Sequence, residues 1–301
     1  MDMMKSYSCL SDTIGDVFGG HTQIEKRVPV SGGDINRAYL LSLMNGEKVF
    51  MKANSRKNID FFTAEAEGLS AIRKTAAINV PLVLAIGTEP AEDMSFLLLE
   101  YIEPGRRGGR SSFEDLGEKL ARMHLSAAGS FVQNGKFGFL HDNYIGTGVQ
   151  INDPRDSWIT FFTECRLLPQ YERASSYFGH ADKKRFESLF CSLNRYLVEP
   201  KKPALLHGDL WSGNYMIDAD GRPWLIDPAV YVGHPEADLA MTELFGGFEH
   251  VFYDAYREAA GIDPGYRERR DLYNLYHLLN HLNMFGSGYL QSVISIVRRF
   301  V

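Results

Sequence analysis

The feature that most constrains the fold is a short apolar run followed at once by a polar loop, residues 205–214 with the sequence LLHGDLWSGN. A second acidic residue, Asp227, follows thirteen positions after Asn214. Between them, residues 218–221 (DADG) are a hairpin signal flanked by apolar residues. The pattern predicts a strand that ends in a polar loop, and then a hairpin whose return strand carries Asp227 close to Asn214.

The residue types in this loop are those that phosphoryl transfer requires, because this reaction depends on positioning and charge neutralisation more than on covalent chemistry. We predict that Asp209 accepts the hydrogen bond of an attacking hydroxyl group. Asn214 and Asp227 are predicted to give oxygen ligands to a Mg²⁺ ion on nucleotide phosphates. His207 is expected to brace the loop by bonding to nearby backbone. Asp and Asn are common turn formers, but their spacing and context favour the catalytic interpretation.

Strand-like runs near the start of the chain suggest how a nucleotide is held. Gly32 and Gly33 lie between two such runs and permit a turn whose backbone N–H groups approach phosphate, although an ordinary hairpin turn is the commoner use of a Gly pair. After the turn signal Asn45-Gly46, Lys52 alternates within an apolar strand and is placed to reach phosphates. The alternative is a solvated strand lysine.

The next segment, residues 58–72, has the composition and apolar spacing of a helix. Packed on the sheet, it can present Glu65 to Lys52 and hold the ammonium group against the nucleotide. Glu67 competes for this role, but it points about 200° away around the helix. One of the two glutamates therefore faces the sheet, and the other faces solvent.

Two more strand-like runs, residues 81–87 and 95–102, complete a five-stranded antiparallel sheet. The backbone of Glu100, Tyr101 and Ile102 ends the last strand and is predicted to hydrogen-bond an adenine edge between two halves of the molecule. The Pro, Gly and Arg residues that follow have the composition of a linker. We expect an α+β fold, with a sheet-rich domain at residues 1–102 and a mainly helical domain at residues 103–301.

The composition is that of an ordinary globular protein, with 45% hydrophobic and 23% charged residues. A net charge of −6 argues against a nucleic-acid partner, which needs a basic surface. No apolar run has membrane-spanning length and the start lacks a signal-peptide pattern, so we expect a cytoplasmic protein without a membrane partner. The three cysteines suggest neither disulfides nor a zinc site. His277 and His281 have metal-ligand spacing on a helix, but packing is their favoured role.

Three stretches together carry a family resemblance: residues 207–214 (HGDLWSGN), 227–231 (DPAVY) and 236–248 (EADLAMTELFGGF). The chain resembles the fructosamine kinase, or ketosamine-3-kinase, family, a branch of the protein-kinase-like fold related to aminoglycoside phosphotransferases and choline kinases. The resemblance covers nearly the whole chain and is weakest at residues 31–36, where the loop is short. It implies two lobes, an N-lobe with a five-stranded antiparallel sheet plus a helix and a mainly helical C-lobe with catalytic hairpins.

This resemblance implies that ATP, with Mg²⁺, phosphorylates the 3-hydroxyl group of ketosamines, after which the adduct releases its amine in protein deglycation. Fructosamines, ribulosamines and erythrulosamines, as small molecules or on glycated proteins, remain open as acceptors. Asp209 resembles the proton acceptor of the family, Asn214 and Asp227 the metal ligands, and Lys52 the phosphate lysine with Glu65 as its partner.

Candidates for acceptor binding are Trp211, His234, Glu236 and Phe245. The Trp211 ring could pack on the sugar or on the amine-bearing side chain, or simply cap the local core. Two other functions remain open: a small-molecule kinase of the aminoglycoside, choline or homoserine type, and a catalytically silent nucleotide-binding scaffold. No feature of the sequence specifies an oligomeric state.

Overall fold

A six-stranded sheet forms the N-lobe of the computed structural model, which describes residues 6–30, 35–105, 108–132 and 136–301. In chain order, its strands are β1 (Ser6–Tyr7), β2 (Ile24–Val30), β3 (Arg37–Leu43), β4 (Lys48–Ser55), β5 (Val83–Glu89) and β6 (Met94–Glu100). In space the order is β1-β5-β6-β4-β3-β2. Strands β2 to β6 are antiparallel, which confirms the predicted five-stranded sheet. Strand β1, a short strand parallel to β5, was not predicted from the sequence.

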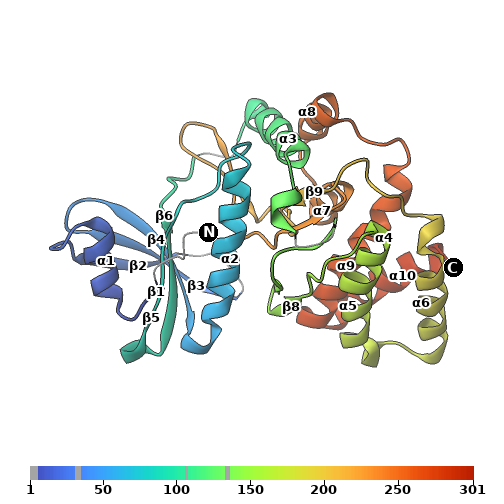
Figure 1. The fold of residues 1–301 in the computed structure, drawn as a ribbon, viewed down its shortest axis with the longest axis horizontal. Helices are drawn as coiled ribbons and strands as arrows, with labels where there is room; N and C mark the ends of the chain where they lie inside the picture. Colours follow the sequence, from blue (N-terminus) through green and yellow to red (C-terminus); the bar gives the residue numbers. More distant parts are fainter. Residues whose placement is uncertain (1–5, 31–34, 106–107, 133–135) are drawn as a thin grey trace.

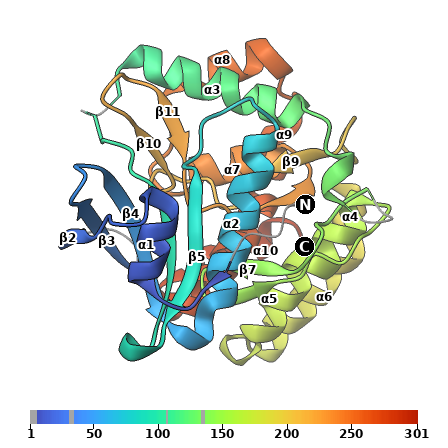
Figure 2. The ribbon, with the colours of Figure 1, turned by 60° about the vertical axis from the view of Figure 1, so that its left-hand side comes forward.

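One helix covers each face of this sheet, as Figure 1 and Figure 2 show. Helix α1 (Leu10–Phe18) packs on the face that carries Phe96 and Leu98, and α2 (Ile59–Lys74) packs on the face that carries Leu97 and Leu99. The four residues are consecutive in β6 because strand side chains alternate between the two faces. Helix α2 lies between the sheet and the C-lobe (Figure 1).

The C-lobe is mainly helical. Its α-helices are α3 (Arg110–Leu125), α4 (Trp158–Phe161), α5 (Leu168–Arg173), α6 (His180–Ser192), α7 (Glu236–Leu244), α8 (His250–Ala260), α9 (Tyr266–Phe285) and α10 (Leu290–Arg299). A π-helical segment, Phe162–Leu167, joins α4 to α5, and a 3₁₀ turn, Ser287–Tyr289, follows α9.

Three two-stranded ladders complete the C-lobe: β7 (Asn143–Ile145) with β8 (Gly148–Gln150), β9 (Ala204–Leu206) with β12 (Tyr231–Gly233), and β10 (Tyr215–Ile217) with β11 (Pro223–Leu225). The predicted hairpin around residues 218–221 is the β10–β11 ladder.

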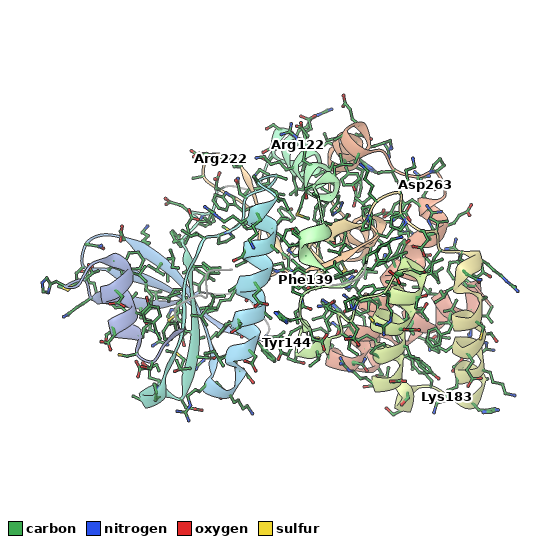
Figure 3. The ribbon with its side chains drawn as sticks, in the orientation of Figure 1. Arg122, Phe139, Tyr144, Lys183, Arg222 and Asp263 are labelled. Atoms are coloured by element: carbon green, nitrogen blue, oxygen red, sulfur yellow. The ribbon has the colours of Figure 1, made fainter. Side chains whose placement is uncertain are left out.

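Contacts of α2 and of the linker join the two lobes. After β6, the Gly105 N–H donates to the Ile217 carbonyl at 2.9 Å, which ties the linker to the β10–β11 hairpin. Phe61 of α2 packs on Tyr144 of β7 with ring centroids 4.2 Å apart, and Figure 3 shows Tyr144 beside α2 at the junction of the lobes. A Cβ on Gly68 of α2 would lie 3.2 Å from Cγ of Pro228, so this helix also packs closely on the C-lobe.

The C-lobe core is rich in aromatic side chains. Trp158 is fully buried, and its ring centroid lies 5.1 Å from that of Phe162 and 6.1 Å from that of Tyr273. Cys165 is buried nearby as a free thiol. Among the helices that the structure describes, none combines the length and the apolar character needed to cross a membrane.

Candidate active site

The catalytic loop, residues 207–214, starts at the end of β9, which pairs with β12. His207 is buried, its Nε2 lies 2.9 Å from the carbonyl oxygen of Ile226, and its own carbonyl accepts the Ala229 N–H at 2.9 Å. Gly208 has a φ of +83°, and a Cβ there would lie 2.0 Å from the Ala229 carbonyl oxygen. Only glycine fits, because a side chain would be both strained and in collision. The loop is thereby held against the segment that follows Asp227.

Asp238 of α7 holds the start of the loop by hydrogen bonds. Its carboxylate accepts the N–H groups of His207 at 2.7 Å and of Gly208 at 2.8 Å, and it lies 3.1 Å from Nε2 of His124. Burial alone would raise the pKa of Asp238, but the hydrogen bond with His124 and the nearby imidazoles hold it below its usual value. This role of Asp238 was not predicted from the sequence, because an acidic residue at the start of a helix indicates only a cap.

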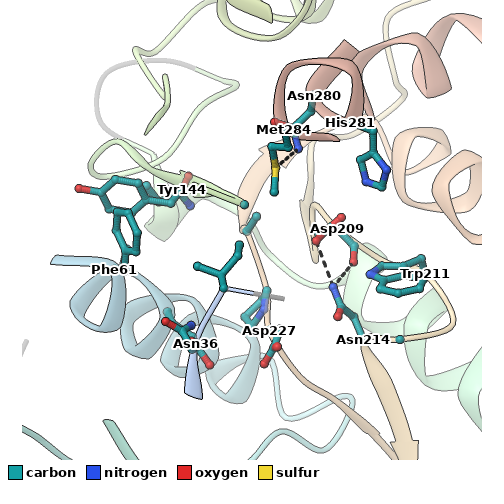
Figure 4. A pocket seen from close by; sticks show the side chains of 18 of the residues that line it. Asn36, Phe61, Tyr144, Asp209, Trp211, Asn214, Asp227, Asn280, His281 and Met284 are labelled. Atoms are coloured by element: carbon teal, nitrogen blue, oxygen red, sulfur yellow. Dashed lines mark hydrogen bonds between the residues drawn. The ribbon is translucent and has the colours of Figure 1, made fainter. Parts of the chain in front are cut away.

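Asp209 and Asn214 are joined within the loop. The Asn214 Nδ2 donates to the Asp209 carbonyl at 2.8 Å and to its Oδ2 at 3.1 Å (Figure 4). Burial raises the pKa of the Asp209 carboxyl to about 7; the bond from Asn214 opposes this rise, and the charge of Asp227 adds to it. The Asp209 side chain keeps 24% of its surface exposed. A carboxylate that is reachable and titrates near neutrality suits a proton acceptor.

Asp227, two residues after the end of β11, has a φ of +56°. This conformation costs a non-glycine residue on the order of 1–3 kcal/mol, so the surroundings must impose it. Its carboxylate contacts Nζ of Lys52, which also lies 2.6 Å from Oε1 of Glu65. Glu65 is thus the glutamate of α2 that contacts the lysine.

Burial by itself would lower the pKa of Lys52, but the carboxylates of Asp227 and Glu65 outweigh it and raise the pKa above its ordinary value. Burial raises the pKa of Glu65, and the adjacent ammonium group opposes that rise. Lys52 is therefore a permanently charged group, held in one place between the two lobes. Such a cation is suited to phosphate oxygens.

The oxygen atoms around Asp227 fit a hard cation such as Mg²⁺. The Asn214 amide nitrogen donates to Asp209, so the amide oxygen of Asn214 is available as a metal ligand. The Asp227 side chain is 40% exposed and has a second oxygen beside the one that contacts Lys52. In the part of the chain that the structure describes, no group of three or more His, Cys, Asp or Glu residues could hold a metal. A nucleotide-bound Mg²⁺ needs fewer protein ligands, because phosphates and waters complete its shell.

One cavity of about 800 Å³ is lined by Lys52, Glu65, Asp209, Asn214 and Asp227. Beyond them, its far wall consists of rings: Phe245 stacks on His281 with centroids 4.6 Å apart, and Trp211 meets Phe245 edge-on at 6.2 Å. Phe285 and Tyr289 lie 5.2 and 5.1 Å from His281. We call these five residues the aromatic wall.

Figure 4 shows Asn280, His281 and Met284 of α9 opposite Asp227, with Phe61 and Tyr144 closing one side of the cavity. These α9 residues were not among the site residues predicted from the sequence. Their contribution depends on how α9 packs, and no local pattern reports that packing.

His234 and Glu236 do not line the cavity, contrary to the expectation that they face the acceptor. Glu236 is buried and accepts two hydrogen bonds from Arg269, at 2.8 and 2.6 Å. His234 packs against Trp158 and Tyr273. The physical reason is that Arg269, on α9, gives Glu236 a buried partner, so this pair belongs to the C-lobe interior.

The remaining predicted site residues lie as follows. Glu100, Tyr101 and Ile102 are at the end of β6 and the start of the linker, outside the cavity lining. The Glu100 N–H donates to the Leu82 carbonyl at 2.9 Å, and its carboxylate accepts the Leu82 N–H at 3.1 Å. Gly32 and Gly33 lie outside the described residues.

The chain has the protein-kinase-like fold of a class of phosphotransferases. A crystal structure of a macrolide 2'-phosphotransferase from Brachybacterium faecium has a TM-score of 0.61 to this chain, covering 96% of this chain and 97% of the other. At 15% identity, this likeness shows the fold alone.

The chain belongs to the fructosamine kinase family, whose sequence profile matches residues 6–301. It is 41% identical over 293 residues to a protein of Synechocystis sp. named a probable ketoamine kinase, covering 96% of this chain and 94% of that protein. It is 41% identical over 285 residues to the chloroplastic protein-ribulosamine 3-kinase of Oryza sativa subsp. indica, covering 93% of this chain and 80% of that protein. A crystal structure of a candidate fructosamine-3-kinase from Haemophilus somnus 129PT has a TM-score of 0.84 at 31% identity, covering 97% of both chains.

Proposed function

We propose that this chain is an ATP-dependent kinase that phosphorylates the 3-hydroxyl group of ketosamines, as small molecules or on glycated proteins. One observation carries the proposal: Asp209, Asn214, Asp227 and Lys52 line one cavity in a chain of the fructosamine kinase family. The rice relative is named for ribulosamine. Ribulosamines are therefore the first acceptors to test.

The proposed reaction is in-line transfer of the terminal phosphoryl group. Asp209 takes the proton of the acceptor hydroxyl as its oxygen bonds to phosphorus and the bond to ADP breaks. The Asn214 hydrogen bonds and the Asp238 anchor keep Asp209 in place for this step. Lys52, held by Glu65, binds phosphate oxygens.

Asn214 and Asp227 are the residues that would hold Mg²⁺, which supplies neutralisation of phosphate charge when it is bound. The contact of Lys52 with Asp227 supports this assignment, because it brings the phosphate-binding cation and a metal ligand together. For the nucleotide, the backbone of Glu100, Tyr101 and Ile102 remains the proposed adenine contact, and the turn at Gly32 and Gly33 remains a proposed phosphate contact. The division into domains at residues 1–102 and 103–301 is part of the same proposal.

The acceptor is proposed to bind against the aromatic wall. The acidic residues in the cavity lining are Glu65, Asp209 and Asp227, and each already has a role toward the nucleotide, the metal or the reacting hydroxyl. The ammonium group of a ketosamine would therefore be stabilised by the faces of Trp211 and Phe245 through cation–π contacts. His234 and Glu236 have no part in this proposal.

The test is an ADP-release assay with Mg²⁺–ATP and a panel of ribulose-lysine, fructose-lysine, choline and an aminoglycoside, with an EDTA control. We expect release only with a ketosamine and only with Mg²⁺, and phosphorus NMR should place the phosphate on the 3-oxygen. Turnover of choline or of the drug would replace this function by the small-molecule kinase alternative. Silence with every acceptor would favour a nucleotide-binding scaffold.

If the 3-phosphate forms, its breakdown with release of free lysine would make the chain a deglycation enzyme. Amino-acid analysis of the reaction mixture over several hours measures that release directly. We propose the cytoplasm as the compartment, although the rice relative is named as chloroplastic.

A further inference from the structure

The conformation of Asp227 requires support from both sides, since its φ of +56° is unfavourable for a residue with a side chain. On the N-terminal side, the Ile226 N–H donates to the Asn214 carbonyl at 3.0 Å, and His207 contacts the Ile226 carbonyl. These bonds come from the catalytic loop. The support on the C-terminal side comes partly from another place in the chain.

Two side chains of the β7–β8 hairpin hold the backbone that follows Asp227. The Gln150 Nε2 donates to the Ala229 carbonyl at 2.9 Å, and the Asn143 Nδ2 donates to the Val230 carbonyl at 2.8 Å. Gln150 also donates to Oδ1 of Asn143 at 2.7 Å, so the two amides are joined. They are 2% and 5% exposed, and water therefore does not compete for these bonds.

The hairpin is itself fixed by buried groups of the C-lobe. The Tyr276 hydroxyl of α9 donates to Oε1 of Gln150 at 2.6 Å, so that the Gln150 amide uses both of its ends. Arg166, fully buried in the π-helical segment, donates to Oδ1 of Asn152 at 2.7 Å and lies 3.9 Å from the centroid of the Tyr231 ring. Asn152 in turn donates to Oδ1 of Asn143 at 3.0 Å. The Gln150 and Asn143 amides, which donate to the backbone after Asp227, are therefore held in place by each other and by the C-lobe interior.

From this network we propose that Gln150, with Asn143, is a positioning residue: it fixes the backbone after Asp227 and thereby aims the Asp227 carboxylate at the metal of the nucleotide. The inference rests on the proposed function, because it takes Asp227 as a metal ligand. Neither amide needs to touch the reacting atoms. Their effect appears in how strongly Mg²⁺ improves ATP binding.

The experiment measures ATP affinity by calorimetry, once with Mg²⁺ and once with EDTA, in the full chain. Gln150→Met keeps the size of the side chain and removes its hydrogen bonds. We expect Mg²⁺–ATP to bind about tenfold more weakly, and ATP in EDTA to bind as in the unchanged protein.

Two single-hydroxyl variants keep the test decisive if Gln150→Met does not fold. Tyr276→Phe removes only the bond to Gln150 and should weaken Mg²⁺–ATP binding by a smaller factor, leaving binding in EDTA unchanged. Tyr196→Phe is the matched control, since it removes one hydroxyl bond, to the Phe300 carbonyl, near the C-terminus. It should leave both affinities unchanged.

The positioning role of Gln150 would be overturned if Mg²⁺ enhanced ATP binding equally in three proteins: Tyr276→Phe, any Gln150 variant that folds, and the unchanged protein. This holds whatever the stabilities of the variants. The proposed function fails separately. If the unchanged protein binds Mg²⁺–ATP but phosphorylates no ketosamine, the acceptor assignment falls and the role of Gln150 stands. Absence of any Mg²⁺ effect on ATP binding in the unchanged protein would remove both.

Discussion

Asp238 offers a quantitative test of how the catalytic loop is held. Replacing it with alanine leaves the buried N–H groups of His207 and Gly208 without their acceptor. Each unsatisfied buried donor costs about 1–3 kcal/mol, so Asp238→Ala should lower the free energy of unfolding by about 2–6 kcal/mol. Asp238→Asn keeps one acceptor oxygen and should cost about 1.5–3 kcal/mol, the value of one hydrogen bond to a charged group.

The assay is urea unfolding followed by tryptophan fluorescence, combined with steady-state kinetics on the acceptor that the panel identifies. We expect Asp238→Asn to lower kcat, because losing one of the two bonds that hold the loop displaces Asp209. Asp263→Asn is the matched control, since Asp263 is 56% exposed and its pair with Arg269 should contribute less than about 1 kcal/mol. An Asp238→Asn protein that matches this control in both stability and kcat would refute the reasoning.

Three further predictions concern backbone approach and pH. Gly208→Ala should abolish measurable turnover, because the Cβ of the alanine would lie 2.0 Å from the Ala229 carbonyl oxygen. Circular dichroism shows whether the variant still folds. Full activity of the variant would contradict the close contact. Gly68→Leu should raise the KM for ATP, because α2 must move away from Pro228 and carry Glu65 with it. Thr63→Leu, on the exposed side of α2, is the control and should leave this KM unchanged. Equal KM values in the two variants would argue against the packing of α2 on Pro228. Burial, reinforced by the charge of Arg269, lowers the pKa of His234 to about 3. In the unfolded chain the His234 imidazole binds a proton near pH 6.5, whereas in the folded chain it stays neutral until the pH is near 3. The free energy of unfolding that this difference contributes is fully present above pH 6.5 and is lost as the pH falls toward 3. Between pH 6.5 and 5, the loss should be about 2 kcal/mol larger in the unchanged protein than in His234→Gln, as measured by urea unfolding; parallel pH profiles would contradict a buried neutral imidazole.

Local pattern was enough to predict the parts of the site that are close in sequence. The turn signal at Asn45-Gly46 gives a hairpin with Gly46 at a φ of +88°, and this turn sets the register of β4 and so the direction of Lys52. A second hairpin, β10–β11, likewise brings Asn214 near Asp227. In both cases a short loop fixes the geometry, and the sequence signal of that loop is strong.

Features that depend on distant partners could not be predicted in this way. Glu236 looked like a cavity residue because its sequence context does not reveal Arg269, which pairs with it 33 residues later. His281 and the rest of the wall from α9 join the site through tertiary packing, as does Gln150 through the Ala229 carbonyl. Long-range hydrogen bonds and packing leave no periodicity in a single sequence, so only the structure reveals them.

The measurement that tests the central claim most directly is a single-turnover experiment with ribulose-lysine. Excess protein, saturated with Mg²⁺–ATP, is mixed with the acceptor, and formation of the 3-phosphate is followed for the unchanged protein and for Asp209→Asn at equal nucleotide occupancy. If Asp209 accepts the proton of the attacking hydroxyl, the variant should transfer the phosphoryl group about 10²–10⁴-fold more slowly. Transfer at the same rate in both proteins would contradict the account.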